Sequence, residues 1–194
     1  LTTLSTLSPV SGRFEAIVAD DRTMAVVDYA HTPDALDNVL QTIEEVRKPQ
    51  QQLFVVCGCG GDRDRTKRPE MAQIAVRYAT TAIFTSDNPR TESAEAILDD
   101  MVAGVGEARN YLRITDRREA IRTASTLAKA GDIILVAGKG HEDYQEIKGQ
   151  KYPMDERVLI REVLEEAGIK ITETDCAENI LQTAESKPSP SRIS

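Results

Sequence analysis

The sequence contains no tryptophan and few other aromatic residues, with three phenylalanines and five tyrosines among 194 residues. It also has no excess of basic charge, because 24 lysines and arginines stand against 32 acidic residues and give a formal net charge of −8. Nucleic-acid binding depends largely on basic side chains that displace counterions from phosphates. The composition therefore argues against nucleic acid as a partner.

Cysteine is also scarce, and the three cysteines do not match a zinc site. Cys57 and Cys59 form a C-x-C pair, Cys176 lies far away, and the two histidines are distant in sequence. We expect no metal site and no disulfide framework, but reduced thiols in a cytoplasmic protein. Cys57 is expected to end a buried strand as a small apolar residue.

Long apolar runs are missing too. No stretch approaches the roughly 18 apolar residues of a membrane-spanning helix. Residues 1–15 have neither the basic region nor the apolar region of a signal peptide. We therefore expect no membrane association.

Short apolar runs alternate along the chain with stretches of helical periodicity, which predicts βαβ units and a mostly parallel sheet. Strands are expected at 24–29, 53–58, 82–86, 112–115 and 132–138, and helices at 33–47, 70–78, 93–102, 117–129 and 155–167. Continuous apolar runs are typical of central strands covered on both faces. The predicted fold is a Rossmann-like, doubly wound, three-layer α/β/α domain.

The two ends of the sequence differ from its middle. Residues 1–11 contain leucines but no complete element, and residues 171–194 are polar, with Ser and Pro at their close. We expect residues 1–11 to be a linker from a preceding domain and residues 12–170 to be the folded domain. The segment 171–194 is expected to lack fixed structure.

Polar and glycine-rich segments follow four of the expected strands. In open α/β sheets, ligands bind beyond the carboxyl ends of the strands. The four segments would meet at that edge, where a hydrophobic core gives no reason for so many polar residues. They are DYAHTPD (28–34), GCGGDRDRTKRPE (58–70), SDNPR (86–90) and GKGHEDYQ (138–145).

The second of these segments combines glycines with positive charge. Glycines permit close backbone approach, and basic side chains near a helix N-terminus suit a carboxylate or phosphate. The alternative is a glycine turn with solvated charges, which we favour for Arg65. The segment matches neither a Walker A loop nor G-x-G-x-x-G, because Arg63 stands in place of the third glycine. The residues concerned are Gly58, Gly60, Gly61, Arg63, Arg65, Lys67 and Arg68.

The third and fourth segments carry groups that could bind an amino-acid head group. Arg90 offers a planar fork to a carboxylate, and Asn88, held extended by Pro89, can both donate and accept. An Asx-turn that merely caps the next helix explains the same residues equally well. Glu142 could accept from an ammonium group. A single His141 is more often an orienting or packing residue, and no Ser or Cys is paired with it as a hydrolase triad requires.

Asp28 and His31 lie at the end of the first expected strand. An acid at this position often accepts from ribose hydroxyls in nucleotide-binding α/β folds. The alternative is that Asp28 accepts from local backbone N–H groups and that His31 caps the loop before Pro33.

These motifs, in this order, resemble those of the Mur ligases, and within them the branch that adds meso-diaminopimelate. The resemblance covers roughly residues 10–168, and five motifs in one order are highly specific. They are GRFE (12–15), VVDYAHTPDAL (26–36), GCGGDRD with KRPEM (58–71), SDNPRTE (86–92) and GKGHEDYQ (138–145).

The resemblance implies an activity in peptidoglycan and cell-wall synthesis. The family joins an amino acid to a growing UDP-muramoyl peptide: ATP with Mg²⁺ phosphorylates a peptide carboxylate, and the incoming amine attacks the acyl phosphate. Three domains cooperate, and this chain resembles the third. The P-loop, the magnesium ligands and the site for UDP-N-acetylmuramoyl-L-alanyl-D-glutamate would lie in the others. This domain would then hold no catalytic residue and be inactive alone.

By the same resemblance, DNPR marks a site for meso-diaminopimelate in place of L-lysine. Diaminopimelate carries a second carboxylate that Arg90 and Asn88 could bind, whereas a lysine side chain would bring another cation to Arg90. The implied amino-acid site consists of Arg63, Asp87, Asn88, Pro89, Arg90, Gly138 and Glu142. The implied contacts to the adenosine side of ATP are Arg13, Asp28 and His31.

Two functions of other classes fit parts of the sequence. A free-standing module could bind an amino acid without any chemistry. A nucleotide-dependent oxidoreductase would suit the fold class, but the missing G-x-G-x-x-G disfavours it. Ligases that add glutamate to folate share the domain architecture, yet DNPR and GKGHEDYQ are not expected together there.

Overall fold

The computed structural model describes residues 13–172 of the chain. These residues form a seven-stranded sheet, a separate two-stranded hairpin and five helices. The strands are β1 (Glu15–Ala19), β2 (Met24–Asp28), β3 (Leu53–Cys57), β4 (Thr81–Phe84), β5 (Tyr111–Arg113), β6 (Ile133–Ala137), β7 (Tyr144–Ile147), β8 (Gln150–Pro153) and β9 (Ile171–Thr172). The helices are α1 (Pro33–Val46), α2 (Lys67–Tyr78), α3 (Ala94–Val102), α4 (Arg117–Leu127) and α5 (Glu156–Glu166).

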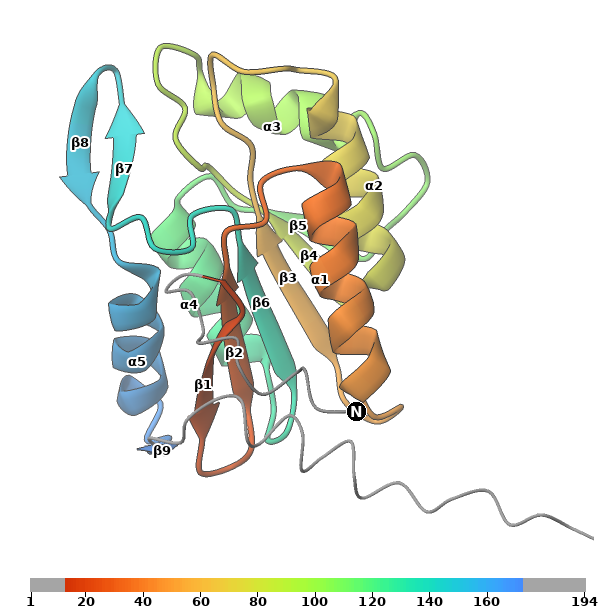
Figure 1. Ribbon diagram of the computed structural model, residues 1–194, viewed down its shortest axis with the longest axis vertical. Helices are drawn as coiled ribbons and strands as arrows, with labels where there is room; N and C mark the ends of the chain where they lie inside the picture. Colours follow the sequence, from red (N-terminus) through yellow and green to blue (C-terminus); the bar gives the residue numbers. More distant parts are fainter. Residues whose placement is uncertain (1–12, 173–194) are drawn as a thin grey trace, which may run out of the picture.

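The sheet is mostly parallel and lies between two layers of helices (Figure 1). Its strand order is β5-β4-β3-β6-β2-β1-β9, in which β1 is antiparallel to both of its neighbours. Helices α1, α2 and α3 cover one face, and α4 and α5 cover the other. The three-layer, Rossmann-like fold expected from the sequence is confirmed.

The central strands β3 and β6 are buried at all five positions of each. Successive side chains of a strand point to opposite faces of the sheet. Val55 therefore packs in the core beneath α1, α2 and α3, whereas Phe54 and Val56 pack in the core beneath α4 and α5. Apolar residues are needed at every position of such strands, which explains the continuous runs LFVVC and IILVA.

The strand register brings four loop-bearing strand ends to one edge of the sheet. Asp28 of β2 lies opposite Ala137 of β6, and Cys57 of β3 lies opposite Phe84 of β4. The loops that follow β2, β3, β4 and β6 therefore begin at the same level. The gathering of polar segments that the sequence predicts is present in the fold.

Local signals decide where the helices begin. Four of the five helices start after a residue whose side-chain oxygen accepts from a backbone N–H of the first turn. These N-caps are Thr32, Ser93, Asp116 and Asp155. The helix expected to begin at Glu70 begins at Lys67 instead. Pro69 lies in its first turn, where a missing N–H costs no helical hydrogen bond.

The apolar pattern does not predict β1, β7, β8 or β9. The hairpin of β7 and β8 is built of largely polar residues, and its turn is formed by Lys148 and Gly149, with φ of 50° and 77°. Two successive positive φ values suit a two-residue hairpin turn. Strand β9 pairs with β1. Its two residues, Ile171 and Thr172, were expected to lack fixed structure but form this strand, so the folded domain extends past residue 170.

Among residues 13–172, no helix has the length and apolar character needed to cross a membrane. The expected linker at residues 1–11 lies outside the described residues. So do residues 173–194, which include Cys176 and most of the expected tail.

Candidate functional site

Three of the polar loops converge on Asn88 at the carboxyl edge of the sheet. The loop after β3 reaches it through Gly61, whose N–H donates to Asn88 O at 2.9 Å. Strand β7 follows the loop after β6 and contacts the residue before Asn88, because Gln145 Nε2 donates to Asp87 O at 2.7 Å. Segments far apart in sequence thus form one site around the loop after β4.

The Asn88 side chain is held at both ends of its amide and is 3% exposed. Its Oδ1 accepts from Lys139 Nζ at 2.9 Å and from the Glu146 backbone N–H at 2.8 Å. Its Nδ2 donates to Glu142 Oε2 at 2.9 Å. Asn88 therefore links the loop after β4 to the loop after β6 and to the hairpin.

The side chain of Lys139 is fully buried beside two carboxylates. Its ammonium lies 3.4 Å from Glu142 Oε2 and 4.0 Å from Asp87 Oδ1. A buried ammonium needs opposite charge close by. Two acids and one cation leave this cluster with one net negative charge, which suits a cationic group of a ligand.

Arg90 extends over the same edge from an unusual backbone position. Its φ of 52° is in the left-handed region that side chains rarely adopt. The hairpin holds it there, because Arg90 N–H donates to Glu146 O and Arg90 O accepts from Lys148 N–H. Its Nη1 donates to Gly61 O at 2.9 Å, and its Nε lies 3.5 Å from Glu146 Oε2. With 23% of the side chain exposed, the guanidinium is both fixed and accessible.

Two glycines allow the loops to lie this close together. A Cβ at Gly61 would lie 1.9 Å from Pro89 O, and a Cβ at Gly138 would lie 2.7 Å from Asp87 Oδ2. Gly138 also has a φ of 121°, which favours glycine. The glycine-rich segment after β3 was expected to permit a close backbone approach. Gly61 makes such an approach to the loop after β4.

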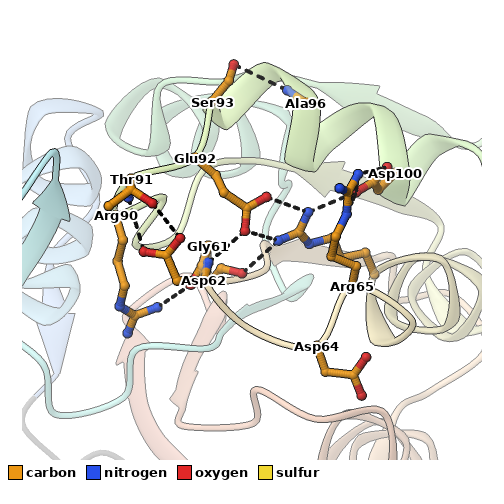
Figure 2. A network of polar contacts seen from close by, with 12 residues as sticks. Gly61, Asp62, Asp64, Arg65, Arg90, Thr91, Glu92, Ser93, Ala96 and Asp100 are labelled. Atoms are coloured by element: carbon orange, nitrogen blue, oxygen red, sulfur yellow. Dashed lines mark hydrogen bonds and ion pairs between the residues drawn. The ribbon is translucent and has the colours of Figure 1, made fainter.

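A second network connects the loop after β3 to α3 (Figure 2). Arg68 is fully buried and donates to both Glu92 oxygens, at 3.0 and 2.8 Å, and to Asp100 Oδ2 at 2.8 Å. Glu92 also accepts from the Asp62 N–H at 2.6 Å, and Asp62 Oδ1 accepts from the Thr91 hydroxyl. The hydrogen bonds from Arg68 lower the pKa of Glu92 and of Asp100. This network fixes the residues that directly follow Arg90.

On the other face of the sheet, Arg117 and Glu156 form an ion pair with both side chains fully buried and an Nε–Oε1 distance of 2.5 Å. Arg117 Nη2 donates to Ala137 O at 2.9 Å and Nη1 donates to Ser86 O at 3.4 Å. Each of these carbonyls directly precedes a predicted site residue. Burial raises the pKa of Glu156, whose Oε2 has no partner among the described residues.

A pocket of about 430 Å³ lies between the end of β2 and α1, and its lining includes Arg13, Asp28 and His31. Asp28 Oδ1 accepts from the Ala30 N–H and Oδ2 from the Phe14 N–H, both at 2.7 Å. The local backbone contacts considered for Asp28 are therefore present. A contact from Asp28 to a ribose stays a prediction.

Tyr29 lies between this pocket and the converging loops. Its ring centroid is 4.6 Å from that of His31 and 5.3 Å from that of His141. His141 thus packs against an aromatic ring, as expected of a single histidine here. The pocket and the Asn88 site are neighbours along one edge of the sheet.

The described cysteines are free thiols, of which Cys57 is buried and Cys59 is half-buried. Cys57 ends β3 with no exposure, as predicted, and burial raises its pKa to about 12. Burial also raises the pKa of Cys59. Within residues 13–172, no group of three or more His, Cys, Asp or Glu side chains is arranged to hold a metal ion.

The predicted site residues fall into three places. Those that lie together at the converging loops are Asp87, Asn88, Pro89, Arg90, Gly138 and Glu142. Those that line the pocket are Arg13, Asp28 and His31. Arg63 is exposed on the loop after β3, and so is Arg65, which pairs with Asp100 at 2.9 Å.

Sequence reasoning missed the burial of three cations around the site, Arg68, Arg117 and Lys139. Lysine and arginine are seldom fully buried, so residue type gives no reason to expect this burial. Lys139 alone carried a signal, because it stands between two glycines within one of the motifs.

Comparison with known proteins identifies the family. A family model described as "Mur ligase, glutamate ligase domain" matches residues 12–140. The chain belongs to the Mur ligase family. Two curated Mur ligase relatives are each named UDP-N-acetylmuramoyl-L-alanyl-D-glutamate–2,6-diaminopimelate ligase. The relative from Cytophaga hutchinsonii is 53% identical over 167 residues, covering 85% of this chain and 34% of the relative. The relative from Listeria monocytogenes is 53% identical over 163 residues, covering 84% and 33%.

One solved structure agrees with this membership, and a second shares the fold. A Mur ligase structure of the same name has a TM-score of 0.76 and 48% identity, covering 84% of this chain and 33% of that chain. A folylpolyglutamate synthase from Thermotoga maritima shares the fold, with a TM-score of 0.51 and 20% identity. The chain spans about a third of the length of the Mur ligases that it matches.

Proposed function

We propose that this chain is the amino-acid-binding domain of an ATP-dependent ligase that adds meso-diaminopimelate to UDP-N-acetylmuramoyl-L-alanyl-D-glutamate. The observation that carries the proposal is the convergence of Asn88, Arg90 and Glu142 at one edge of the sheet. The relatives described above carry this amino acid in their names.

The chemistry of the distal end of meso-diaminopimelate matches the groups at this edge. That end has a carboxylate and an ammonium. Arg90 and Asn88 Nδ2 can donate to the carboxylate, with Arg63 as a further cation on the adjoining loop. Glu142 and Asp87 can accept from the ammonium. L-Lysine has no distal carboxylate, so its ammonium would face the Arg90 guanidinium.

We further infer that the pocket beside Tyr29 receives the adenosine side of ATP. Its volume of about 430 Å³ falls within the range of roughly 300–1,000 Å³ for small-molecule sites. Asp28, held by two backbone N–H groups, is a fixed acceptor for a ribose hydroxyl, and Arg13 and His31 line the same pocket. The sequence contains no Walker A loop. Other domains would therefore supply the phosphate cradle, the magnesium ligands and the UDP-dipeptide site.

The test is an NMR titration of the chain with meso-diaminopimelate and with L-lysine. We expect saturable shifts at the Asn88 and Arg90 signals with diaminopimelate and none with lysine. Arg90→Ala should abolish the shifts. Arg109→Ala removes an exposed arginine whose hydrogen bond, among the described residues, goes to the neighbouring Ala108 O, and it should leave the shifts unchanged. Equal binding of the two amino acids would refute the proposed specificity.

A further inference from the structure

The orientation of the Asn88 amide is fixed by the nature of its partners. A backbone N–H and a lysine ammonium can only donate, so the atom that faces Glu146 N–H and Lys139 Nζ must be the oxygen. An ionised carboxylate can only accept, so the atom that faces Glu142 must be the NH₂ group. Asn88 therefore presents a donor on the side of Glu142, and a flipped amide would place like groups against each other at all three contacts.

Lys139 is the partner that connects this orientation of Asn88 to the two acids. It is 0% exposed, and its ammonium lies among Asn88 Oδ1, Glu142 Oε2 and Asp87 Oδ1 at 2.9, 3.4 and 4.0 Å. The same cation draws Glu142 Oε2 toward the interior. A neutral side chain of similar length would remove the donor to Asn88 and leave Glu142 without its buried counter-charge.

We infer that Lys139 is a positioning residue that makes the site select a carboxylate. Together with the Glu146 N–H, it holds the Asn88 NH₂ group toward Glu142, so that Asn88 and Arg90 can both offer N–H groups to the ligand. It also offsets part of the negative charge of Asp87 and Glu142, so that these acids attract less strongly a cation that carries no carboxylate. This inference rests on the proposed function for the identity of the ligand, but the orientation of Asn88 does not depend on it.

Two methionine variants of the chain test the inference. Lys139→Met removes the buried cation. Lys151→Met is the matched control, because Lys151 is exposed and lies 4.0 Å from the centroid of the same Tyr144 ring that Lys139 approaches at 5.6 Å. Dissociation constants for meso-diaminopimelate and L-lysine are measured by NMR titration, with amide signal dispersion as the check on folding.

We expect Lys139→Met to weaken diaminopimelate binding by about tenfold or more, as for loss of a charge-assisted hydrogen bond. Its preference for diaminopimelate over lysine should fall, and Lys151→Met should keep the wild-type preference. A folded Lys139→Met chain with the wild-type preference would overturn the inference.

A measurement without ligand separates this inference from the proposed function. The side-chain amide signals of Asn88 should move in Lys139→Met and stay in place in Lys151→Met. If the wild-type chain does not bind diaminopimelate, the proposed function fails for this chain, yet a moved Asn88 signal still supports the positioning role. An unmoved signal overturns that role.

A third measurement applies if Lys139→Met does not fold. The ¹⁵N signal of the Lys139 ammonium in the wild-type chain should then shift with saturating diaminopimelate and not with L-lysine. No shift at saturation would contradict the role of Lys139.

Discussion

Two buried arginines support the loop after β4 from opposite faces of the sheet, and they are held in different ways. Arg68 of α2 donates to Glu92 and Asp100, whose side chains are 25% and 29% exposed. Arg117 of α4 donates to Glu156 with both side chains at 0% exposure. One arginine thus meets its acids at the edge of the solvent, and the other is sealed with its acid inside the protein.

The difference concerns what each acid can do if its arginine is removed. Glu92 and Asp100 can turn to water, which solvates a carboxylate well. Glu156 has no such alternative, and its Oε2 already lacks a partner among the described residues. The sealed pair is therefore more costly to break, although both arginines lie next to the same site. The Arg68 side of the site should tolerate change better than the Arg117 side.

The largest effect is expected from Arg117→Met. The change leaves the Glu156 carboxylate buried without its paired cation, and breaking such a pair typically costs about 3–5 kcal/mol of unfolding free energy. Urea denaturation of the chain would measure the loss. The double variant Arg117→Met/Glu156→Leu should recover most of it, because an apolar pair of similar volume replaces the charges. A double variant as unstable as the single one would assign the loss to the carbonyl contacts at Ser86 and Ala137.

A smaller effect is expected from Arg68→Met. The free energy of unfolding should fall by about 1–3 kcal/mol, since hydrogen bonds to charged groups are lost but both acids regain water. The matched control is Arg65→Met, in which an exposed arginine loses its pair with Asp100. The control should change stability by less than about 1 kcal/mol. If Arg68→Met were as damaging as Arg117→Met, solvent access to the acids would not explain the difference.

The sequence predicts the sheet well where both faces are covered. β3 and β6 are continuous apolar runs, and of the helices between them α3 and α4 begin after side-chain caps, whereas α2 does not. The hairpin of β7 and β8 has mostly polar residues, so an apolar pattern does not predict it. Its turn has positive φ at Lys148 and Gly149, and of these two residues Gly149 alone is of a type that signals a turn. Strand β9 has two residues, too few for any periodic pattern.

The sequence predicts residues that gather at the converging loops, but it does not predict the buried cations that hold them in place. Asn88, Arg90 and Glu142 stand in polar motifs directly after strands. The buried cations become visible only in the fold, because Arg68 meets Glu92 24 residues away, Arg117 meets its acid 39 residues away, and Lys139 meets Asn88 51 residues away. A cation can be buried only where the fold brings such partners into contact with it, and no local sequence pattern predicts that contact.

The smallest expected effect is a difference in how the two variants respond to acid. Burial raises the pKa of Glu156 above its ordinary value of 4.5, and loss of the Arg117 charge would raise that pKa further. The Arg117→Met variant should therefore regain stability as the pH falls toward 4.5, because protonation removes the stranded charge. As the pH is lowered, its stability deficit relative to the wild-type chain should therefore begin to shrink while the pH is still above 4.5.

The Arg68→Met deficit should respond in a lower pH range. Arg68 lowers the pKa of Glu92 and Asp100 below their ordinary values of 4.5 and 3.8. The stability that these ionised acids give the wild-type chain is present above those values and is lost as the pH falls through the lowered ones. This deficit should then shrink only below pH 4.5. Urea midpoints of the three chains between about pH 7 and pH 3 would locate both changes. If both stability deficits shrank in the same pH range, the fully buried pair and the solvent-edge pairs would titrate alike. That result would contradict the expected effect of their different burial.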